Sequence, residues 1–355
     1  MPDLRAAIIG FGLAGSVFHA PLLASTAGLS VASVVTRDPG RRERAEREHP
    51  GVRVFDEADE LFAHGDEHDL VVVAAPNEAH VPLARRALDA GLPAVVDKPL
   101  APSAADARGL VEHAEARGLL LTVFMNRRWD SDQLTLRRLI EEGSLGSVLS
   151  YESRFERWRP QLSEKQPWRE RTPPEAGGGV LLDLGTHLVD QALALFGSVA
   201  HVYAEVAARR GGPADDDSFL VLQHHSGPRS LLWASTLAAA PGPRLRVLGD
   251  RAAYVLAGLD GQEDALRAGR RPGDPDDQWG VEPASRWGRL MAGDEEEAAP
   301  SEPGAWPRFY ALLERALREG GPPPVDPWDA VRGLELLEAA RRSAAEAAAV
   351  ALPAG

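Results

Sequence analysis

Short apolar segments recur along the first third of the chain, and most are followed by glycine or polar residues. They lack the alternation of a half-exposed strand, which is typical of strands buried on both faces of a parallel sheet. These segments are Ala6–Ile9, Leu29–Val35, Val52–Phe55, Leu70–Ala74, Pro93–Val96 and Leu119–Phe124. Helical patterns such as Val81–Ala90 and Ala104–Ala116 lie between several of them. The alternation predicts a doubly wound parallel sheet over residues 1–125, a Rossmann-type α/β domain with its ligand at the carboxyl ends of the strands.

A different pattern follows residue 126, where alternating apolar positions predict strands with one exposed face. The predicted strands are Val148–Phe155, Ala200–Val206, Ser218–His224, Ser230–Leu237, Arg244–Leu248 and Ala252–Leu256. The predicted helices are Asp132–Glu142, Leu181–Leu195, Trp306–Glu319 and the Ala-rich tail Asp329–Val350. We therefore expect residues 126–355 to form an α+β domain with a largely antiparallel open sheet, whose tail packs back on the first domain. The stretch Arg270–Gly304, rich in Pro, Gly, Asp and Glu, is interpreted as a long surface loop.

Composition agrees with two globular domains. The chain has 355 residues, more than one ordinary core holds, with 44% hydrophobic and 26% charged residues. Its net charge of −14 disfavours nucleic acid and anionic membranes as partners. It has no cysteine, no signal-peptide pattern and no apolar run of the ~18 residues that a membrane span needs. We expect a soluble, cytoplasmic protein.

A glycine motif follows the first predicted strand and precedes a helical stretch. Its residues are Gly10, Phe11, Gly12, Leu13, Ala14 and Gly15. The first glycine permits a tight turn, the second lets the backbone approach a pyrophosphate, and the third lets helix and strand pack. Amides at the helix N-terminus then face the phosphates. In this context the motif predicts a dinucleotide-binding site rather than a structural turn.

The end of the second predicted strand bears on the choice of cofactor. Thr36 occupies the position where an acid usually binds the adenosine ribose, and Arg37 and Asp38 follow it. Arg37 can pair with a 2′-phosphate, which slightly favours NADP, whereas Asp38 can serve NAD, and a plain turn fits as well. Both cofactors stay open. The neighbouring arginines alternate with glutamates and are interpreted as a solvated helix face: Arg41, Arg42, Arg44 and Arg47.

Three polar residues are candidates for proton transfer beside such a cofactor. Lys98 follows the fifth predicted strand and points towards the crevice of the sheet, although an ordinary surface lysine fits the same pattern. Asp183 and His187, spaced i and i+4 after a glycine run, share a helix face separate from the apolar stripe. Histidine titrates near neutral pH, and a carboxylate one turn away can orient it or bind a hydroxyl. A solvated polar face fits this spacing equally well.

The order of these motifs resembles the glucose-fructose oxidoreductase/inositol dehydrogenase (Gfo/Idh/MocA) family over nearly the whole chain. The glycine motif, the segment after the fourth predicted strand, the Lys98 segment and the helix with Asp183 and His187 carry the resemblance. The second and third of these supply residues with implied contacts to the nucleotide: Ala75, Pro76, Asn77, His80, Asp97 and Lys98. Asp97 departs conservatively from the family's usual glutamate. The resemblance implies that Lys98 lies near the nicotinamide, that Asp183 binds substrate, and that His187 is the general acid/base.

The same resemblance implies a sugar, inositol or related polyol as substrate, with a secondary alcohol and a ketone interconverted by hydride transfer. Residues suited to sugar faces and hydroxyls are Asn126, Arg128, Trp129, Arg157 and Trp168. Packing or surface ion pairs explain each of them singly. Two alternative functions are an NAD-dependent glycosidase that uses transient oxidation, and a non-catalytic dinucleotide sensor.

No metal site is predicted, because the chain lacks ligand spacings such as His-Glu-x-x-His. The acidic run Asp215–Asp217 is interpreted as a solvated turn rather than a calcium site. The resemblance also implies a homodimer or homotetramer that forms through the open face of the second sheet.

Overall fold

The computed structural model describes residues 2–162, 168–274 and 278–353. The chain forms two compact units, each assembled from three segments. The first unit contains Met1–Trp129, Gly261–Trp279 and Ala305–Val331, and the second contains Asp130–Asp260, Gly280–Gly304 and Arg332–Gly355. Segments that are distant in the sequence therefore share a unit, and the division into linear domains at residues 125 and 126 stays a prediction.

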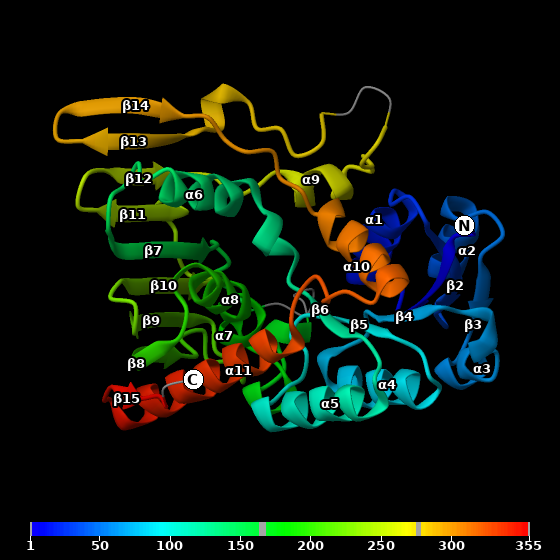
Figure 1. Cartoon of the computed structure of the whole chain (residues 1–355). Helices are drawn as coiled ribbons and strands as arrows, with labels where there is room; N and C mark the ends of the chain where they lie inside the picture. The colour runs from blue at the N-terminus through cyan, green and yellow to red at the C-terminus, as the bar shows by residue number, and fades with distance from the viewer. Residues whose placement is uncertain (1, 163–167, 275–277, 354–355) are drawn as a thin grey trace. The chain divides into compact units, whose positions relative to one another are not determined.

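A parallel six-stranded sheet forms the core of the first unit, in the order β3-β2-β1-β4-β5-β6 (Figure 1). Its strands are Leu4–Ile9 (β1), Leu29–Val35 (β2), Arg53–Phe55 (β3), Leu70–Val73 (β4), Ala94–Asp97 (β5) and Leu121–Phe124 (β6). Every residue of β4, β5 and β6 is buried, as expected for strands covered on both faces. The strand order reverses between β1 and β4, so the ligand crevice of this unit lies at the carboxyl ends of those strands.

The helices of this unit lie between its strands or join it from later segments of the chain. They are η1 (Ala14–His19), α1 (Ala20–Ala24), α2 (Pro39–Glu48), α3 (Ala58–Phe62), α4 (Asn77–Asp89), α5 (Ala104–Arg117), α9 (Gln262–Arg267) and α10 (Pro307–Glu319). Ser103 caps α5 by accepting a hydrogen bond from the amide of Asp106 at 3.1 Å. The helix α10 comes from late in the sequence. Its Phe309 ring packs edge-on against the Phe124 ring of β6, with 5.0 Å between the ring centroids. The end of the sheet is thus closed by aromatic contacts.

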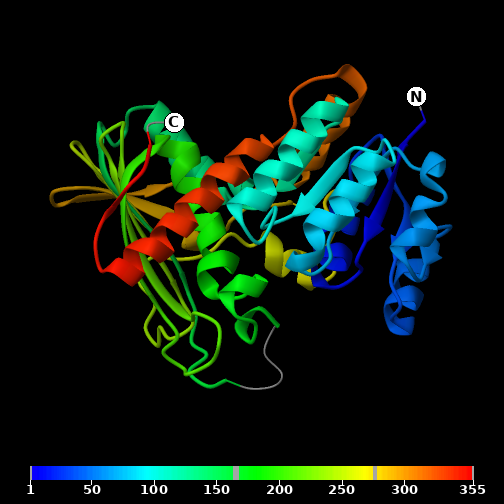
Figure 2. The same cartoon turned by 90° about the horizontal axis from the view of Figure 1, so that it is seen from below.

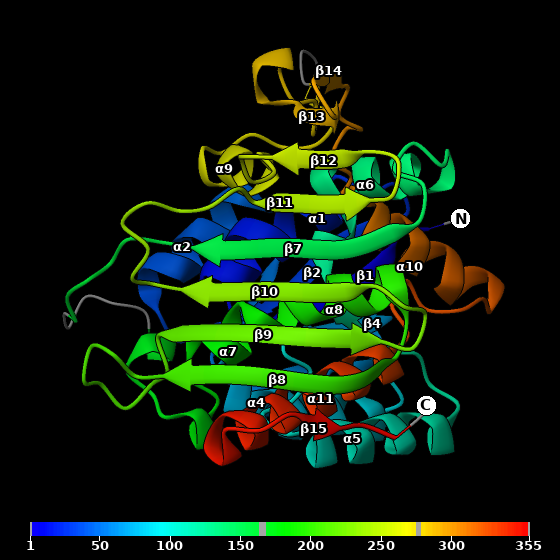
Figure 3. The same cartoon turned by 90° about the vertical axis from the view of Figure 1, so that its left-hand side faces the viewer.

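The second unit is built on a mixed sheet that is nine-stranded over the described residues, in the order β14-β13-β12-β11-β7-β10-β9-β8-β15 (Figure 3). The strands are Val148–Glu156 (β7), Val199–Ala207 (β8), Asp217–His224 (β9), Arg229–Ser235 (β10), Leu245–Gly249 (β11), Ala253–Leu256 (β12), Gly288–Ala292 (β13), Glu295–Ala299 (β14) and Val350–Ala351 (β15). The neighbours β7 and β10 are parallel, and the other neighbouring strands are antiparallel. The predicted α/β and α+β fold is confirmed.

Helices cover one face of this sheet. They are α6 (Ser131–Glu141), α7 (Val180–Asp183), α8 (Gly185–Phe196) and the part of α11 (Pro327–Glu346) that follows Val331. The helix α8 packs against β7 and β10, and Figure 2 shows this sheet nearly edge-on with helices along one face. Burial alternates along β9, with Ser218, Leu220 and Leu222 buried and their neighbours half-buried. The alternation of apolar and polar residues thus correctly predicted a sheet with one covered face.

The interpretation of Arg270–Gly304 as a surface loop is wrong for its second half. Residues 288–299 form the hairpin β13–β14, in which Ala292 pairs with Glu295 across a two-residue turn. Gly293 occupies the first turn position with φ of 61°, the conformation that such turns require. The Glu-rich composition of β14 reflects an exposed strand at the edge of the sheet, where charge discourages pairing with other chains.

The predicted helix Leu181–Leu195 is divided in two. The break falls at Leu184, with φ of −100° and ψ of −36°, and the segments Pro174–Asp183 and Gly185–Phe196 are bent by 59°. The amides of His187 and Leu188 both donate to the carbonyl oxygen of Leu184. Asp183 and His187 therefore do not lie one turn apart on a continuous helix.

No single helix of the described ranges is long and apolar enough to cross a membrane. One bent pair, Pro174–Asp183 with Gly185–Phe196, passes the test by length and composition. Most residues of α7 and α8 are buried in the second unit, so their apolar composition has a packing explanation.

Candidate active site

The glycine motif follows β1, where the strand order reverses. A Cβ on Gly10, whose φ is 96°, would lie 2.5 Å from the carbonyl oxygen of Ala74. A Cβ on Gly15 would lie 2.0 Å from the carbonyl oxygen of Gly10, so glycine is required at both positions. A Cβ on Gly12 would instead approach only the Arg41 guanidinium among the described residues, at 3.8 Å. The open space at Gly12 lets a pyrophosphate approach the backbone.

The remaining motif residues have different surroundings. Phe11 is buried, and its ring packs edge-on against His49 with 6.4 Å between centroids. Leu13 is 49% exposed, and Ala14 begins η1. Phe11 is thus a core residue whose contribution to a nucleotide site is limited to its backbone.

Thr36 and Arg37, the two residues after β2, have different partners. Thr36 is buried, and its hydroxyl accepts a hydrogen bond from the amide of Asp38 at 3.3 Å. The Arg37 side chain is 74% exposed and pairs with Glu57. A 2′-phosphate that binds Arg37 must therefore compete with this carboxylate.

Two arginines of α2 lie closer to the glycine motif. Arg44 Nη1 donates to Ser16 Oγ at 2.9 Å and so joins α2 to η1. Its side chain is about one-third exposed, so the interpretation of the arginine cluster as a solvated helix face is wrong for this member. Arg41 borders the space at Gly12 and is the phosphate-binding candidate that sequence reasoning missed.

His80 joins the loops that follow β4 and β5. Its buried ring has Nδ1 2.7 Å from the carbonyl oxygen of Pro99 and Nε2 2.9 Å from the carbonyl oxygen of Ala75. The two contacts join the ring to the backbone of both loops, so His80 links the loop after β4 to the loop after β5. Nearby, Asn77 is buried at the start of α4, and Pro76 before it is exposed.

Asp97 ends β5 and is buried beneath the loop that carries Lys98. Its Oδ1 accepts a hydrogen bond from the Lys98 amide at 2.9 Å and lies 3.7 Å from His19 Nε2. Burial raises the pKa of the Asp97 carboxyl, but nearby donors and positive charges, His19 first, outweigh burial and lower the pKa below its ordinary value. His19 also contacts the Tyr310 hydroxyl at 2.6 Å. Asp97 is therefore an ionised anchor for this loop.

Asp183 and His187 belong to the second unit. Arg169 Nε lies 3.5 Å from Asp183 Oδ1, and the side chains are 25% and 26% exposed. The His187 residue is buried, with its ring centroid 6.1 Å from that of Phe155. Lys98 belongs to the first unit, so the union of the three residues in one catalytic set stays a prediction.

A buried cation supports the helix face that carries His187. The Arg244 guanidinium lies 4.2 Å from the centroid of the Phe155 ring, and its Nη2 donates to Gln191 Oε1 at 2.9 Å. Its Nε lies 3.0 Å from Asp132 Oδ2, with both side chains almost fully buried. Sequence reasoning missed this pair, because an arginine in a strand and an aspartate in a helix carry no local signal of their contact.

The predicted substrate residues divide between the units in the same way. Asn126, Arg128 and Trp129 lie in η3 (Asn126–Trp129) of the first unit, where Arg128 Nη2 pairs with Asp329 at 2.9 Å. The Trp129 ring is buried against Phe309, with 5.9 Å between centroids. The second unit carries the other two, Arg157 at the end of β7 and Trp168 in η4 (Trp168–Glu170).

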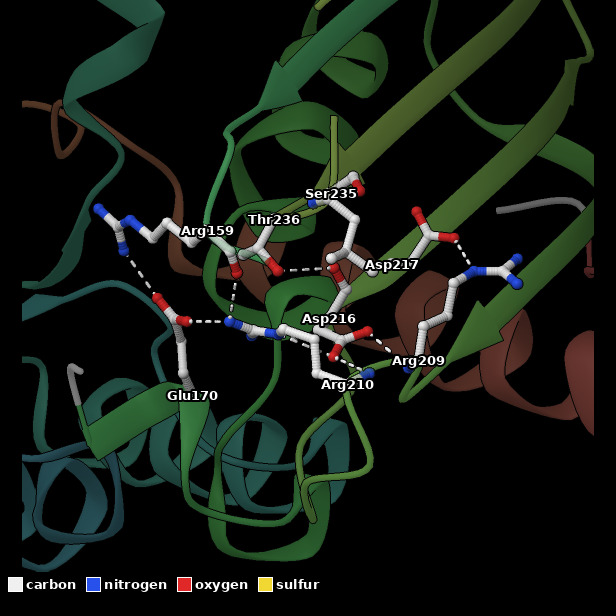
Figure 4. Close-up of polar contacts among 9 residues, drawn as sticks. Arg159, Glu170, Arg209, Arg210, Asp216, Asp217, Ser235 and Thr236 are labelled. Atoms are coloured by element: carbon white, nitrogen blue, oxygen red, sulfur yellow. Dashed lines mark hydrogen bonds and ion pairs between the residues drawn. The ribbon is translucent and has the colours of Figure 1, made fainter. Parts of the chain in front are cut away.

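The interpretation of the acidic run Asp215–Asp217 as a solvated turn is wrong, because two of its three residues are buried. Asp215 and Asp216 are 5% and 1% exposed. Figure 4 shows Arg210 donating to the Asp216 carboxylate and Thr236 donating to the Asp216 carbonyl oxygen, while Asp217 pairs with the exposed Arg209. The two inner carboxylates have arginine partners that sequence spacing did not reveal. Over the described ranges no group of three or more acids, histidines or cysteines could hold a metal ion.

Comparisons with known proteins agree with both sheets. The chain matches the family model described as "Oxidoreductase family, NAD-binding Rossmann fold" over residues 4–125. It matches "Oxidoreductase family, C-terminal alpha/beta domain" over residues 137–352. These two models cover most of the chain.

Similar proteins extend over almost the full length. YdgJ, an oxidoreductase of Escherichia coli, is 39% identical over 352 residues, which cover 99% of each chain. IolW of Bacillus subtilis, a scyllo-inositol 2-dehydrogenase (NADP(+)), is 34% identical over 347 residues, 97% of this chain and 94% of the relative. The solved structure of the yvaA protein from Bacillus subtilis superposes with a TM-score of 0.91 at 33% identity and covers 99% of each chain.

Proposed function

The chain belongs to the Gfo/Idh/MocA family of NAD-binding oxidoreductases, and from this premise we propose that it interconverts a secondary alcohol and a ketone on a sugar, inositol or related polyol, with NADP or NAD. The observation that carries the proposal is the glycine cradle after β1, open at Gly12 and closed to any side chain at Gly10 and Gly15. Such a cradle at the point where strand order reverses fits a dinucleotide pyrophosphate. The named activity of IolW supports a polyol substrate and NADP.

Residues of both units have defined parts in the proposed reaction. A bound nicotinamide supplies a carbon that accepts or returns hydride. His187 takes the proton of the reacting hydroxyl as the carbon loses hydride, and it returns the proton in the reverse direction. Lys98 stabilises negative charge as it develops on the oxygen, and Asp183 holds a substrate hydroxyl. The ionised Asp97 and the buried His80 fix the loops around Lys98.

Arg41 supports the NADP side of the proposal more directly than Arg37. Arg41 borders Gly12, and within the described residues its ion pair with Asp38 is long, with 4.0 Å between Nε and Oδ2, whereas Arg37 is paired with Glu57. A guanidinium without a tight carboxylate partner is free to bind a phosphate in two-point geometry. We therefore propose Arg41 as a further phosphate contact, alongside Arg37.

Coenzyme reduction tests this function. Purified protein is mixed with NADP⁺ or NAD⁺ and with inositols, aldoses and alditols, and absorbance of the reduced nicotinamide is followed. We expect net reduction with at least one polyol. Nucleotide binding without turnover of any substrate would favour the sensor, and glycoside cleavage without net reduction would favour the glycosidase.

Calorimetric titration with NADP and NAD, together with the same assay, distinguishes the contributions of Arg41 and Arg37 to nucleotide binding. Arg41→Ala is expected to weaken NADP binding by roughly 10- to 100-fold, the loss of one charge-assisted contact, and to leave NAD binding nearly unchanged. Arg37→Ala is expected to have a smaller effect because Glu57 already holds that guanidinium. Equal losses for NAD and NADP would contradict a contact to the 2′-phosphate.

A homodimer or homotetramer through the open face of the second sheet is also proposed. Phe219 and Trp233 are half-buried on this face with 4.9 Å between ring centroids, and the Arg154 guanidinium lies 3.8 Å from the Trp233 ring. An apolar aromatic patch of this kind suits a second copy of the same face. Light scattering should give a dimer or tetramer that Trp233→Arg converts to a monomer, and a monomeric native protein would contradict the proposal.

A further inference from the structure

Two adjacent buried carboxylates, Asp215 and Asp216, lie beside the segment that carries Asp183. Neighbouring side chains in an extended segment point in opposite directions. The two carboxylates accordingly contact different elements of the second unit, and each set of contacts leads to Asp183 by a separate path.

The first path runs through the start of α7. Asp215 Oδ2 accepts a hydrogen bond from the Leu181 amide at 2.7 Å, and its carbonyl oxygen accepts one from the Val180 amide at 2.9 Å. Arg341 holds the other carboxylate oxygen at 2.9 Å. These contacts satisfy amides that a helix start leaves without partners. Asp215 therefore fixes the short helix whose last residue is Asp183.

Gly179 makes this approach possible. Its φ is 94°, a conformation that other residues rarely adopt, and a Cβ there would lie 2.2 Å from Asp215 Oδ1. The glycine run before α7 thus admits a carboxylate from a distant part of the chain.

The second path runs through a series of buried charges of alternating sign (Figure 4). Asp216 accepts hydrogen bonds from the amides of Arg209 and Arg210 at 2.8 and 2.9 Å, and from Arg210 Nε at 2.9 Å. Arg210 Nη1 then donates to Glu170 Oε2 at 3.0 Å, and Arg159 Nη1 donates to Glu170 Oε1 at 2.7 Å. The Arg210 side chain is only 3% exposed. Glu170 is consequently held from two sides.

Arg169 is the last member of this path. It precedes Glu170 in η4, and its Nε lies 3.5 Å from Asp183 Oδ1. Its carbonyl oxygen also accepts a hydrogen bond from the Gly179 amide at 2.8 Å, which joins the two paths just before α7. The Trp168 ring lies 4.9 Å from the guanidinium and limits its movement.

We propose that Asp215 and Asp216 together position the Asp183 carboxylate, the first through α7 and the second through Arg210, Glu170 and Arg169. Arg169 and Glu170 are then positioning residues for the substrate hydroxyl that Asp183 binds, which rests on the function proposed above. A buried ion pair adds little net stability to the fold. Separating its two charges is costly, however, because each is then left without solvation, and the pair therefore holds its residues in one arrangement.

Arg169→Met and Glu170→Gln test the inference, with Asp217→Asn as the matched control. Asp217 belongs to the same acidic run, but its pair with Arg209 is largely exposed. With the polyol that the native protein oxidises fastest, Arg169→Met is expected to lower kcat/KM about tenfold or more, mainly through KM. Nucleotide affinity should stay unchanged, Arg169→Lys should recover most of the loss, and Asp217→Asn should match the native protein within about twofold.

Hydrogen exchange of the peptide covering residues 179–188 gives a readout without turnover. We expect faster exchange there in Arg169→Met and Glu170→Gln and native exchange in Asp217→Asn. If Glu170→Gln does not fold, the partly exposed Arg169 carries the test. Native exchange and native KM in Arg169→Met would overturn the inference. Full turnover by Asp183→Asn would instead overturn the proposed role of Asp183.

Discussion

Replacement of His187 by asparagine is expected to lower kcat about 10²- to 10⁴-fold, the contribution of a positioned general base. Asparagine keeps much of the size and polarity of the side chain but cannot take up a proton. His187 is buried beside Phe155, so its environment is shaped by packing rather than by bulk water. The steady-state rate of coenzyme reduction on the best polyol measures the effect.

Two controls make the result specific. His201→Asn changes an exposed histidine on β8 of the same unit and should leave kcat unchanged within about twofold, the usual size of a surface effect. Nucleotide affinity, a property of the first unit, should not respond to His187→Asn. A kcat within about threefold of the native value in His187→Asn would show that another group moves the proton.

Local sequence patterns predicted most of the fold. The six apolar segments and the glycine motif predicted the parallel sheet because strand burial and backbone conformation depend on near neighbours in the sequence. The hairpin β13–β14 was not predicted, because turn residues and three successive glutamates dominate its sequence. An exposed edge strand needs little hydrophobicity, so its sequence is close to that of a loop.

The site was less predictable for a different reason. Motifs predicted Asp183, His187 and Lys98 as site residues, but the polar contacts around Asp183 and His187 join residues that are far apart in the sequence. Glu170 and Arg210 are 40 positions apart, and Gln191 and Arg244 are 53 apart. Asp216 resembled a solvated turn because a run of acids has no visible partner until the chain folds. Burial of a charge is set by tertiary pairing, which periodicity does not report.

Replacement of Arg244 by methionine is expected to reduce the free energy of unfolding by about 3–5 kcal/mol, because it leaves the Asp132 carboxylate buried without its cation. Apart from the ion pair at 3.0 Å, neither oxygen of Asp132 has a hydrogen-bond partner within the described residues. Burial of Tyr254 first, and then the charge of Asp132, raise the pKa of the Tyr254 hydroxyl. Urea unfolding of both proteins measures the loss.

A second substitution distinguishes the buried charge from simple loss of packing. Asp132→Asn in the Arg244→Met background removes the uncompensated charge at nearly constant shape, so the double variant should be more stable than Arg244→Met alone. The exposed pair of Arg289 and Glu296 offers the matched control, where Arg289→Met should cost less than about 1 kcal/mol. If the double variant were less stable than Arg244→Met, packing of the guanidinium on Phe155 and Gln191 would be the dominant contribution. In that case Arg244 would support the His187 face through contact rather than charge.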